Sequence, residues 1–313
     1  MNNILNTNIT IEDILSLAVK KKDIKSMKLN AFTNLFLKVI EPTTRPDSII
    51  YYKENLKLIF DFFILNNVFE TKDINQDIID KYVRFSISRN NKPATINKRI
   101  GILTTSLNRL SELNIIDKPF YKYKRIKETP TKIEPIKLED LKTILNQIEN
   151  MKLSHQLMIY LLIGTGIRRN ELVNIKISNI NFKTKSIYLE FTKSGKPRYC
   201  YFNDKIEQLI LKQIENNRSI KNPYLFALGD GHISKQSVTS MLFKLKKDLN
   251  IDVLSSHKFR HLYATQLLKN GADIFTVKEL LGHANLKMTQ RYLDFTNEEI
   301  KENNFKYNPL NNL

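Results

Sequence analysis

The sequence predicts a mainly α-helical protein with a small β-sheet, organised as a helical bundle followed by a mixed α+β domain. Apolar residues recur three and four positions apart through most of the first 120 residues, which is the period of an amphipathic helix. That period breaks down between Lys122 and Pro135, and beyond Pro135 two short stretches alternate as strands do. A length of 313 residues accommodates two domains of ordinary size.

The N-terminal part contains five apolar-periodic segments. Thr10 with Asp13 makes a weak N-terminal cap for the first, and Pro46 and Pro93 suit the first turn of the third and fifth. The expected helices cover residues 10–18, 29–40, 46–63, 77–88 and 93–113. Because no convincing strand accompanies them, residues 1–122 are expected to form an all-α domain.

Residues 123–135 are expected to link the two domains. The stretch KYKRIKETPTKIEP carries five lysines and arginines and two prolines, a composition that favours extended backbone. A basic linker that lies along a nucleic acid and an ordinary surface loop both explain this pattern.

After Pro135 the expected domain covers residues 136–297, followed by a tail over 298–313. In SIYLEF (186–191) apolar and polar residues alternate, Lys-Ser-Gly-Lys makes a turn, and RYCYF (198–202) returns as a second strand. Gly271 and Gly282 stand where C-terminal helix caps are expected. Helices are expected over residues 138–148, 156–163, 205–216, 235–249, 257–269 and 273–281.

The chain is strongly basic. Fifty lysines and arginines against 32 acidic residues give a net charge of +18, which suits a polyanionic partner because each neutralised phosphate releases counterions. A solvated lysine-rich surface is the alternative. An apolar content of 42% argues against a disordered chain.

Composition also suggests the compartment. Cys200 is the single cysteine, so no intrachain disulfide forms, and this fits a reducing cytosol. No apolar run approaches the ~20 residues of a membrane-spanning helix, and the N-terminus does not read as a signal peptide. A cytoplasmic protein is the expectation.

Three polar motifs stand out in the second domain. In HKFRHLYATQLL (257–268), His257 and Arg260 lie one helical turn apart, where imidazole and guanidinium could clamp an anion or simply form a basic exposed face. In TGIRRNEL (165–172), Gly164 and Gly166 are expected to bracket a turn that delivers Arg168 into the next helix. LLGHANLKMTQRYL (280–293) should place His283 just past a helix end and Tyr292 on the following helix.

These motifs resemble those of the tyrosine recombinase and phage-integrase family. TGIRRNE, HKFRHLYATQLLKNGAD, LLGH and TQRY follow the family's order and spacing, and TKSGKPR resembles its β-hairpin with a catalytic lysine. The resemblance is close over residues 135–300, and KPATINKRIGILTTSLNRL (92–110) matches the last helix of the family's core-binding domain more loosely. It implies a SAM-like all-α core-binding domain and an α+β catalytic domain that form a C-shaped clamp on DNA.

The chemistry expected from these residues is phosphoryl transfer without an obligatory metal or cofactor. The sequence has no cluster with metal-ligand spacing and no glycine-rich phosphate loop. Two arginines, Arg168 and Arg260, could neutralise the non-bridging oxygens of a phosphate. A phenol with a pKa near 10 needs a base and a cationic pocket to attack.

The resemblance assigns a role to each residue of the site. Tyr292 would be the nucleophile that forms a 3′-phosphotyrosyl bond, and Lys193 the general acid for the leaving 5′ oxygen. His257 would be the base or a phosphate donor, and His283 a phosphate hydrogen-bond donor. Glu171 would orient an active-site base or arginine.

Some assignments have competitors. Tyr292 could be a core aromatic residue, Lys196 competes with Lys193, and Arg169 would contact a phosphate or solvent. His261, although inside the family motif, is interpreted as supporting its helix. Surface or structural roles are expected for His155 and His232.

The resemblance also implies partners. The expected DNA contacts outside the catalytic set are Arg99, Lys122, Lys124, Arg125, Arg169 and Lys196. The apolar residues of the tail, Ile300, Phe305, Tyr307 and Leu310, would dock into a neighbouring catalytic domain and make a homotetramer on two duplex sites, with packing in cis as the alternative.

Within the family the chain looks most like Xer recombinases, including the single-recombinase (XerH-like) systems. These resolve chromosome dimers at a dif-type site and usually answer to an FtsK-type DNA translocase. An integrase or invertase of a mobile element, a type IB topoisomerase and a catalytically silent DNA-binding protein are the alternatives. The intact catalytic set argues against the last.

Overall fold

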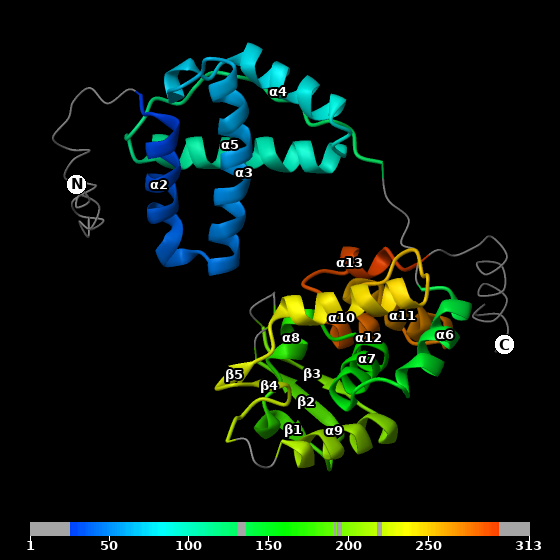
Figure 1. The fold of residues 1–313 in the computed structure, drawn as a ribbon. Coiled ribbons are helices and arrows are strands. Elements are labelled where there is room, and N and C mark those ends of the chain that lie inside the picture. Colours follow the sequence, from blue (N-terminus) through cyan, green and yellow to red (C-terminus); the bar gives the residue numbers. More distant parts are fainter. Residues whose placement is uncertain (1–25, 130–135, 191, 193–195, 218–220, 294–313) are drawn as a thin grey trace, which may run out of the picture. The chain divides into compact units, whose positions relative to one another are not determined.

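The computed structural model describes residues 26–129, 136–190, 192, 196–217 and 221–293 (Figure 1). The chain divides into two compact units, Met1–Pro130 and Thr131–Leu313, and the boundary falls inside the segment predicted to be the linker. The helix predicted over residues 10–18 and the tail over 298–313 lie outside the described residues. The mainly α class with a small β-sheet is confirmed.

The first unit is built from four α-helices within the described residues. Its helix α3 packs against both α2 and α5. The interior is rich in aromatic side chains, since Phe32, Phe36, Phe63 and Tyr82 are all almost fully buried. The helices are α2 (Leu29–Ile40), α3 (Pro46–Leu65), α4 (Gln76–Ser88) and α5 (Pro93–Glu112), with short 3-10 turns at Glu41–Thr43 and Thr71–Asp73.

Local sequence explains where these helices begin. Proline occupies the first turn of α3 and of α5, where its missing N–H costs no hydrogen bond. The side chain of Asn75 accepts from the backbone N–H of Ile78 and caps α4. Among residues 26–129 the β structure is limited to one isolated bridge, Lys28 with Glu70, so this described part of the unit is helical, as predicted.

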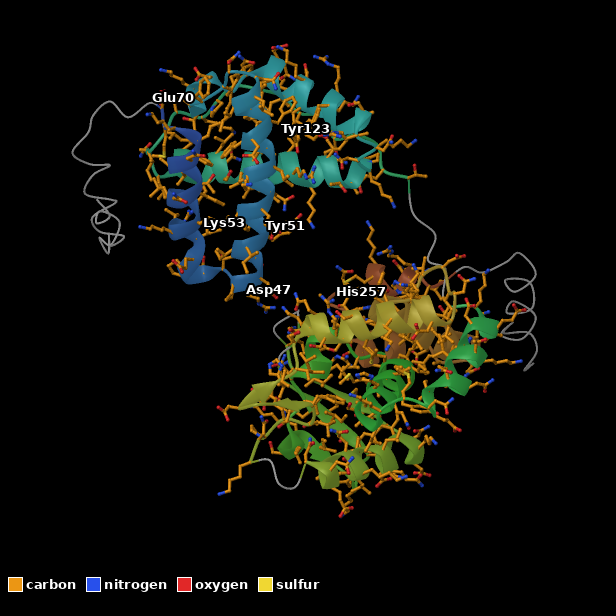
Figure 2. The ribbon with its side chains drawn as sticks, viewed as in Figure 1. Asp47, Tyr51, Lys53, Glu70, Tyr123 and His257 are labelled. Atoms are coloured by element: carbon orange, nitrogen blue, oxygen red, sulfur yellow. The ribbon has the colours of Figure 1, made fainter. Side chains whose placement is uncertain are left out.

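The beginning of the predicted linker is fastened to the helical unit. Buried Asn97 of α5 accepts from the Tyr123 hydroxyl at 2.6 Å and exchanges two hydrogen bonds of 2.9 Å with the backbone of Ile126. Its amide also donates to Glu128 at 2.7 Å, and Figure 2 shows Tyr123 on this unit. Residues 123–129 form neither helix nor strand, and residues 123–128 pack with the first unit through these hydrogen bonds.

The second unit surrounds a central apolar helix. Helix α7 buries Leu157, Met158, Ile159, Leu161, Leu162 and Thr165 and packs against both α9 and α11. The helices are α6 (Leu138–Ile148), α7 (Leu153–Thr165), α8 (Arg169–Val173), α9 (Asp204–Asn216), α10 (Lys235–Asp248), α11 (Ser256–Lys269), α12 (Ile274–Leu281) and α13 (Lys287–Gln290). None of the helices in the described ranges is long and apolar enough to cross a membrane.

A three-stranded antiparallel sheet lies beside these helices, in the order β1-β2-β3. The predicted strands are present as β2 (Ser186–Leu189) and β3 (Arg198–Tyr201), and Ile187 pairs with Cys200. The sequence did not reveal β1 (Ile180–Asn181) or the small pair β4 (Ala227–Leu228) and β5 (Gly231–His232). Two residues are too few to display a period of two.

Two expectations about local structure were wrong. Gly164 lies inside α7 rather than in a turn, at a place where a Cβ atom would come within 2.8 Å of Ile206 Cδ1 on α9. Gly166 alone ends the helix, with φ of 59°. Tyr292 does not lie on a helix, because α13 ends at Gln290 and the Tyr292 N–H bonds to the Thr289 carbonyl in a tighter turn.

Candidate active site

Two arginines from distant segments share one buried carboxylate. Arg168, the residue before α8, donates to Glu171 from its backbone N–H and from Nη1, both at 2.9 Å. Arg198 of β3 donates from Nη2 to the same carboxylate at 2.8 Å. Because the Glu171 and Arg198 side chains are 1% and 7% exposed, this ion-paired group is shielded from water.

The C-terminal end of α12 gathers three arginines. Three consecutive carbonyls each accept from a different guanidinium: Leu280 from Arg198 at 2.5 Å, Leu281 from Arg260, and Gly282 from Arg168 at 3.1 Å. The last carbonyls of a helix have no intrahelical partner and carry the negative end of its dipole. The helix end is therefore the template on which the guanidinium groups are ordered, and we call these three side chains, with Glu171, the arginine cluster.

Gly282 permits this close approach. It has φ of 62°, and a Cβ atom there would lie 2.5 Å from Arg198 Cδ. Both the backbone conformation and the space therefore require glycine at this position. Arg260 is fixed from a second side, since its Nη1 donates to the Gly166 carbonyl at 2.7 Å.

Tyr292 lies between two histidines. Its hydroxyl is 2.9 Å from His261 Nδ1 on α11. Its ring stacks on the His283 ring at a centroid distance of 6.3 Å and an interplanar angle of 12°. Nδ1 of buried His283 is 2.8 Å from the hydroxyl of Thr289, which is fully buried.

The cluster carries excess positive charge. Three guanidinium groups against the one carboxylate of Glu171 leave a net charge of 3 − 1 = +2. Burial, reinforced by Arg168 and Arg198, lowers the pKa of Arg260 to about 9. Burial raises the pKa of Glu171, but the charges of Arg198 and Arg168 outweigh it and hold that pKa below its usual value. An anion such as a phosphate diester would compensate the remaining charge.

The aromatic groups of the site are neutral at pH 7. Burial lowers the pKa of His283 to about 3, with further contributions from Arg260, Arg168 and Arg198. Burial likewise lowers the pKa of His261 to about 4, helped by neighbouring cations. Burial raises the pKa of Tyr292, and the charges of Arg260, Arg291 and Arg168 oppose that rise.

Comparison with known proteins decides the family. The model of the phage integrase family matches residues 134–299. The chain belongs to this family of tyrosine recombinases. Tyrosine recombinase XerA of Pyrococcus furiosus is 35% identical over 182 residues, which are 56% of this chain and 62% of that protein. XerC of Staphylococcus aureus is 30% identical over 246 residues, which are 75% of this chain and 80% of that protein.

Solved structures agree on the fold. The Tn1549 transposon integrase, in complex with a circular intermediate DNA, matches with a TM-score of 0.73 at 16% identity and covers 88% of this chain and 99% of its own. The XerH recombinase bound to a palindromic difH substrate matches with a TM-score of 0.68 at 18% identity and covers 88% and 83%. At these identities the likeness concerns the fold alone.

The structure of this phage-integrase family member brings together most of the predicted catalytic residues. Arg168, Arg260, His283 and Tyr292 lie around the end of α12, and Glu171 fixes Arg168. Lys193 lies outside the described residues. Its competitor Lys196 is exposed beside the hairpin, where its carbonyl accepts from Thr192 at 2.5 Å.

His257 differs from its neighbours in exposure. It lies at the surface of the second unit, one turn before Arg260, which is 4% exposed (Figure 2). The two residues do not present a common exposed face, because Arg260 is turned into the arginine cluster. The charge of His257 contributes to lowering the pKa of His261.

Two residues of the site were missed from the sequence. Arg198 is the last residue of the quoted TKSGKPR stretch, and it shares the inward phase of β3 with Cys200, while Tyr199 and Tyr201 face outward. The signal in the sequence was a charged residue at one of the alternating strand positions that face the interior. His261 was interpreted as supporting its helix, but its ring contacts the Tyr292 hydroxyl.

The other predicted DNA contacts have varied surroundings. Lys122 and Lys124 are exposed, and exposed Arg125 pairs with Glu128 at 3.1 Å. Arg99 is half-buried on α5. Arg169, expected to meet phosphate or solvent, donates to the exposed Thr239 hydroxyl on α10, which is near because α8 packs against that helix.

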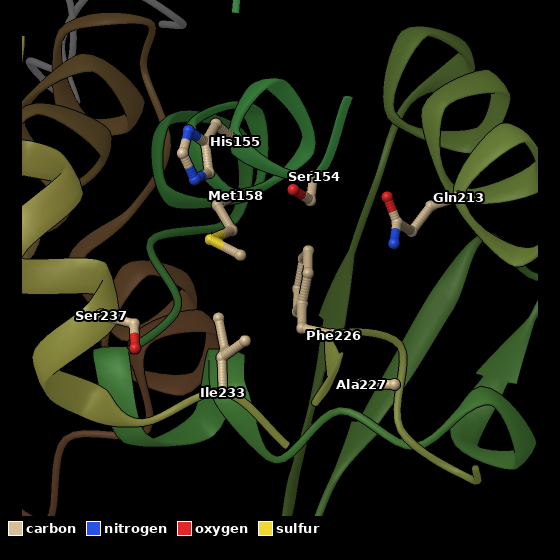
Figure 3. A pocket seen from close by; sticks show the side chains of 8 residues that line it. All are labelled: Ser154, His155, Met158, Gln213, Phe226, Ala227, Ile233 and Ser237. Carbon is tan, nitrogen blue, oxygen red and sulfur yellow. The ribbon is translucent and has the colours of Figure 1, made fainter. Parts of the chain in front are cut away.

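A pocket of about 190 Å³ lies apart from the arginine cluster, in the same unit. Side chains from α7, α9, α10 and the β4 region converge on it (Figure 3). It is lined by Ser154, His155, Met158, Gln213, Phe226, Ala227, Ile233 and Ser237. His155 therefore borders a pocket, whereas His232 is hydrogen-bonded at 2.7 Å to the Ile233 carbonyl.

Proposed function

We propose that this chain is a site-specific DNA recombinase that cuts and rejoins duplex DNA through a 3′-phosphotyrosyl intermediate. The observation that carries the proposal is the convergence of Arg168, Arg198 and Arg260 on the last carbonyls of α12, next to Tyr292. Such a pre-formed cationic site stabilises the charge that develops on phosphorus oxygens without reorganising during the reaction.

In the proposed cleavage step the Tyr292 oxygen attacks phosphorus and the bond to the 5′ oxygen breaks. Arg168 and Arg260 neutralise the non-bridging oxygens, and Glu171 keeps Arg168 in place. Lys193, assigned from its motif, donates a proton to the leaving oxygen. The phosphotyrosyl bond conserves the energy of the broken diester, so the 5′ hydroxyl of a partner strand reverses the step without ATP.

His257 and His283 complete the proposed set. His283 donates to a phosphate oxygen, and its Nδ1 contact with Thr289 fixes the orientation of its ring. His257, which is exposed on α11, contacts a phosphate or serves as a base. No metal or other cofactor takes part in the proposed step.

The finer assignment is an Xer recombinase that resolves chromosome dimers at a dif-like site in the cytoplasm, near the nucleoid. Relatives named XerA and XerC support it. The proposed assembly is a homotetramer on two duplex sites, joined through tail residues 298–313 and controlled by an FtsK-type translocase. Integration or inversion of a mobile element is the alternative.

Covalent trapping tests the proposal. Wild-type protein mixed with a nicked duplex that carries the candidate genomic site is expected to yield a protein–DNA adduct linked to the 3′ phosphate. Two intact sites are expected to exchange strands, which separates a recombinase from an enzyme that only relaxes supercoils. If wild-type protein gave neither adduct nor exchange on chromosomal or mobile-element sites, the proposal would be wrong.

Binding to DNA is expected to weaken steeply with salt. The net charge of +18 and exposed lysines such as Lys122, Lys124 and Lys196 support many phosphate contacts. With six or more contacts, affinity falls on the order of 10³-fold between 50 and 200 mM salt. Fluorescence anisotropy of a labelled duplex measures this dependence, and a flat response would contradict a phosphate-dominated interface.

A further inference from the structure

The Tyr292 hydroxyl has a specific nitrogen neighbour that the proposed mechanism leaves unused. His261 Nδ1 lies 2.9 Å from that oxygen, and the two rings are tilted by 52° at a centroid distance of 5.4 Å. His283, on the other side, presents a ring face to the phenol ring, and its Nδ1 is occupied by Thr289. Of these two histidines, His261 is the one in hydrogen-bond contact with the reacting atom.

We propose that His261 accepts the phenolic proton of Tyr292 as the phenol oxygen attacks phosphorus, which makes it a further catalytic residue of the cleavage step. The inference rests on the proposed recombinase function. It gives the role of base to His261 rather than to His257.

The protonation state of His261 suits this role. Burial, then the charges of His257, Arg291, Lys258 and Arg260, lower its pKa to about 4, so the imidazole is neutral at pH 7. With its proton on Nε2, Nδ1 offers a lone pair to the Tyr292 hydroxyl. Burial keeps the phenol protonated in the absence of DNA, since it raises the pKa of Tyr292.

Substrate would strengthen this base. Among the residues that the structure describes, the charged and titratable groups that act on His261 include His257, Lys258 and Arg260 on its own helix, Arg291 and Tyr292 beyond α13, and His283 before α13. A phosphate diester held by the arginines brings negative charge that offsets these cations. The pKa of His261 therefore rises when DNA binds. Because the proton moves to His261 while the phenol oxygen attacks phosphorus, no free phenolate has to form.

The step is balanced in both directions. On cleavage the O–H bond of Tyr292 breaks and an N–H bond forms at His261 Nδ1, while the oxygen–phosphorus bond forms and the bond to the 5′ oxygen breaks. The leaving oxygen takes its proton from the general acid. On rejoining, the 5′ hydroxyl oxygen attacks phosphorus and gives its proton back to the general acid, the bond between phosphorus and the Tyr292 oxygen breaks, and His261 returns its proton to that oxygen.

Single-turnover cleavage of a nicked duplex tests this role with the substitution His261→Asn. The asparagine amide occupies the position of Nδ1 and keeps a hydrogen bond to Tyr292, but it cannot accept a proton at neutral pH. The variant is expected to bind DNA as wild type does and to cleave about 10²–10⁴-fold more slowly. His155→Asn, at a histidine that lines the separate pocket and none of the site contacts, is the matched control and is expected to cleave normally.

Two further readouts separate a base from a structural contact. A substrate with sulfur in place of the 5′ bridging oxygen releases a thiolate without a proton, so it should restore cleavage by Lys193→Ala but not by His261→Asn.

The wild-type rate should rise with pH through the pKa of His261 in the complex, and His261→Asn should lose that pH-dependent rise. Equal or faster cleavage by His261→Asn, or its rescue by the sulfur substrate, would overturn the inference. Failure of the recombinase proposal is recognised separately, by a wild-type protein that forms no adduct.

Discussion

Replacing Tyr292 with phenylalanine is expected to abolish the covalent protein–DNA adduct while leaving DNA affinity within about two-fold of wild type. The change removes one oxygen and retains the ring, which stacks on His283 and packs against Ala264, Val277 and Leu281. The lost hydrogen bond to His261 costs about 1 kcal/mol of stability. Denaturing electrophoresis after incubation with a nicked duplex measures the adduct.

Tyr263→Phe is the matched control for this experiment. Tyr263 lies on α11 and packs in the same small cluster as Tyr292, so the substitution removes a phenol from the same neighbourhood. It is expected to retain the adduct. An adduct that persisted in Tyr292→Phe would mean that another side chain is the nucleophile.

Arg198→Ala is expected to slow cleavage about 100-fold, although Arg198 is a positioning residue. It ties Glu171 to the Leu280 carbonyl and so connects β3, α8 and the end of α12. Without the Arg198 side chain, Glu171 and the Arg168 that it holds are less firmly positioned. A displacement of about 1 Å in a catalytic group costs on the order of 10²-fold in rate. Single-turnover cleavage and DNA binding, measured on the same preparation, separate misplacement from weak binding.

The same substitution should destabilise the second unit. Removing one partner from the buried ion-paired group costs about 3 kcal/mol, which urea unfolding measures. The pKa of Glu171 in the folded protein is below its usual value of 4.5. The free energy that ionised Glu171 contributes to stability is therefore complete above pH 4.5 and is lost as the pH falls through the folded-state pKa. Arg198→Ala should weaken this acid dependence.

Arg109→Ala provides the comparison for stability. Arg109 pairs with Glu112 at 3.8 Å on the surface of α5, with both side chains at least half exposed, and such pairs contribute about 0–1 kcal/mol. It should unfold nearly as wild type does. If Arg198→Ala behaved like Arg109→Ala in both stability and cleavage, the arginine cluster would not depend on β3.

The sequence by itself determined the family, the class of fold and most helix boundaries. Helices α2 and α6 occupy the predicted ranges 29–40 and 138–148 because apolar spacing and proline are local signals that need no knowledge of the partner. The motifs also singled out Arg168, Arg260, His283 and Tyr292, because each stands in a short pattern that is characteristic of the family.

Tertiary structure alone decided how these groups meet. Arg198 and Leu280 are 82 positions apart, and nothing in local periodicity tells which guanidinium reaches which carbonyl. The same holds for His261 and Tyr292, 31 positions apart, and for Gly164, whose missing side chain makes room for Ile206. A periodic pattern records which side of a helix or strand is buried. The pairing of hydrogen-bond donors with acceptors depends instead on how the helices and strands pack against one another. That packing places three arginines on the end of α12.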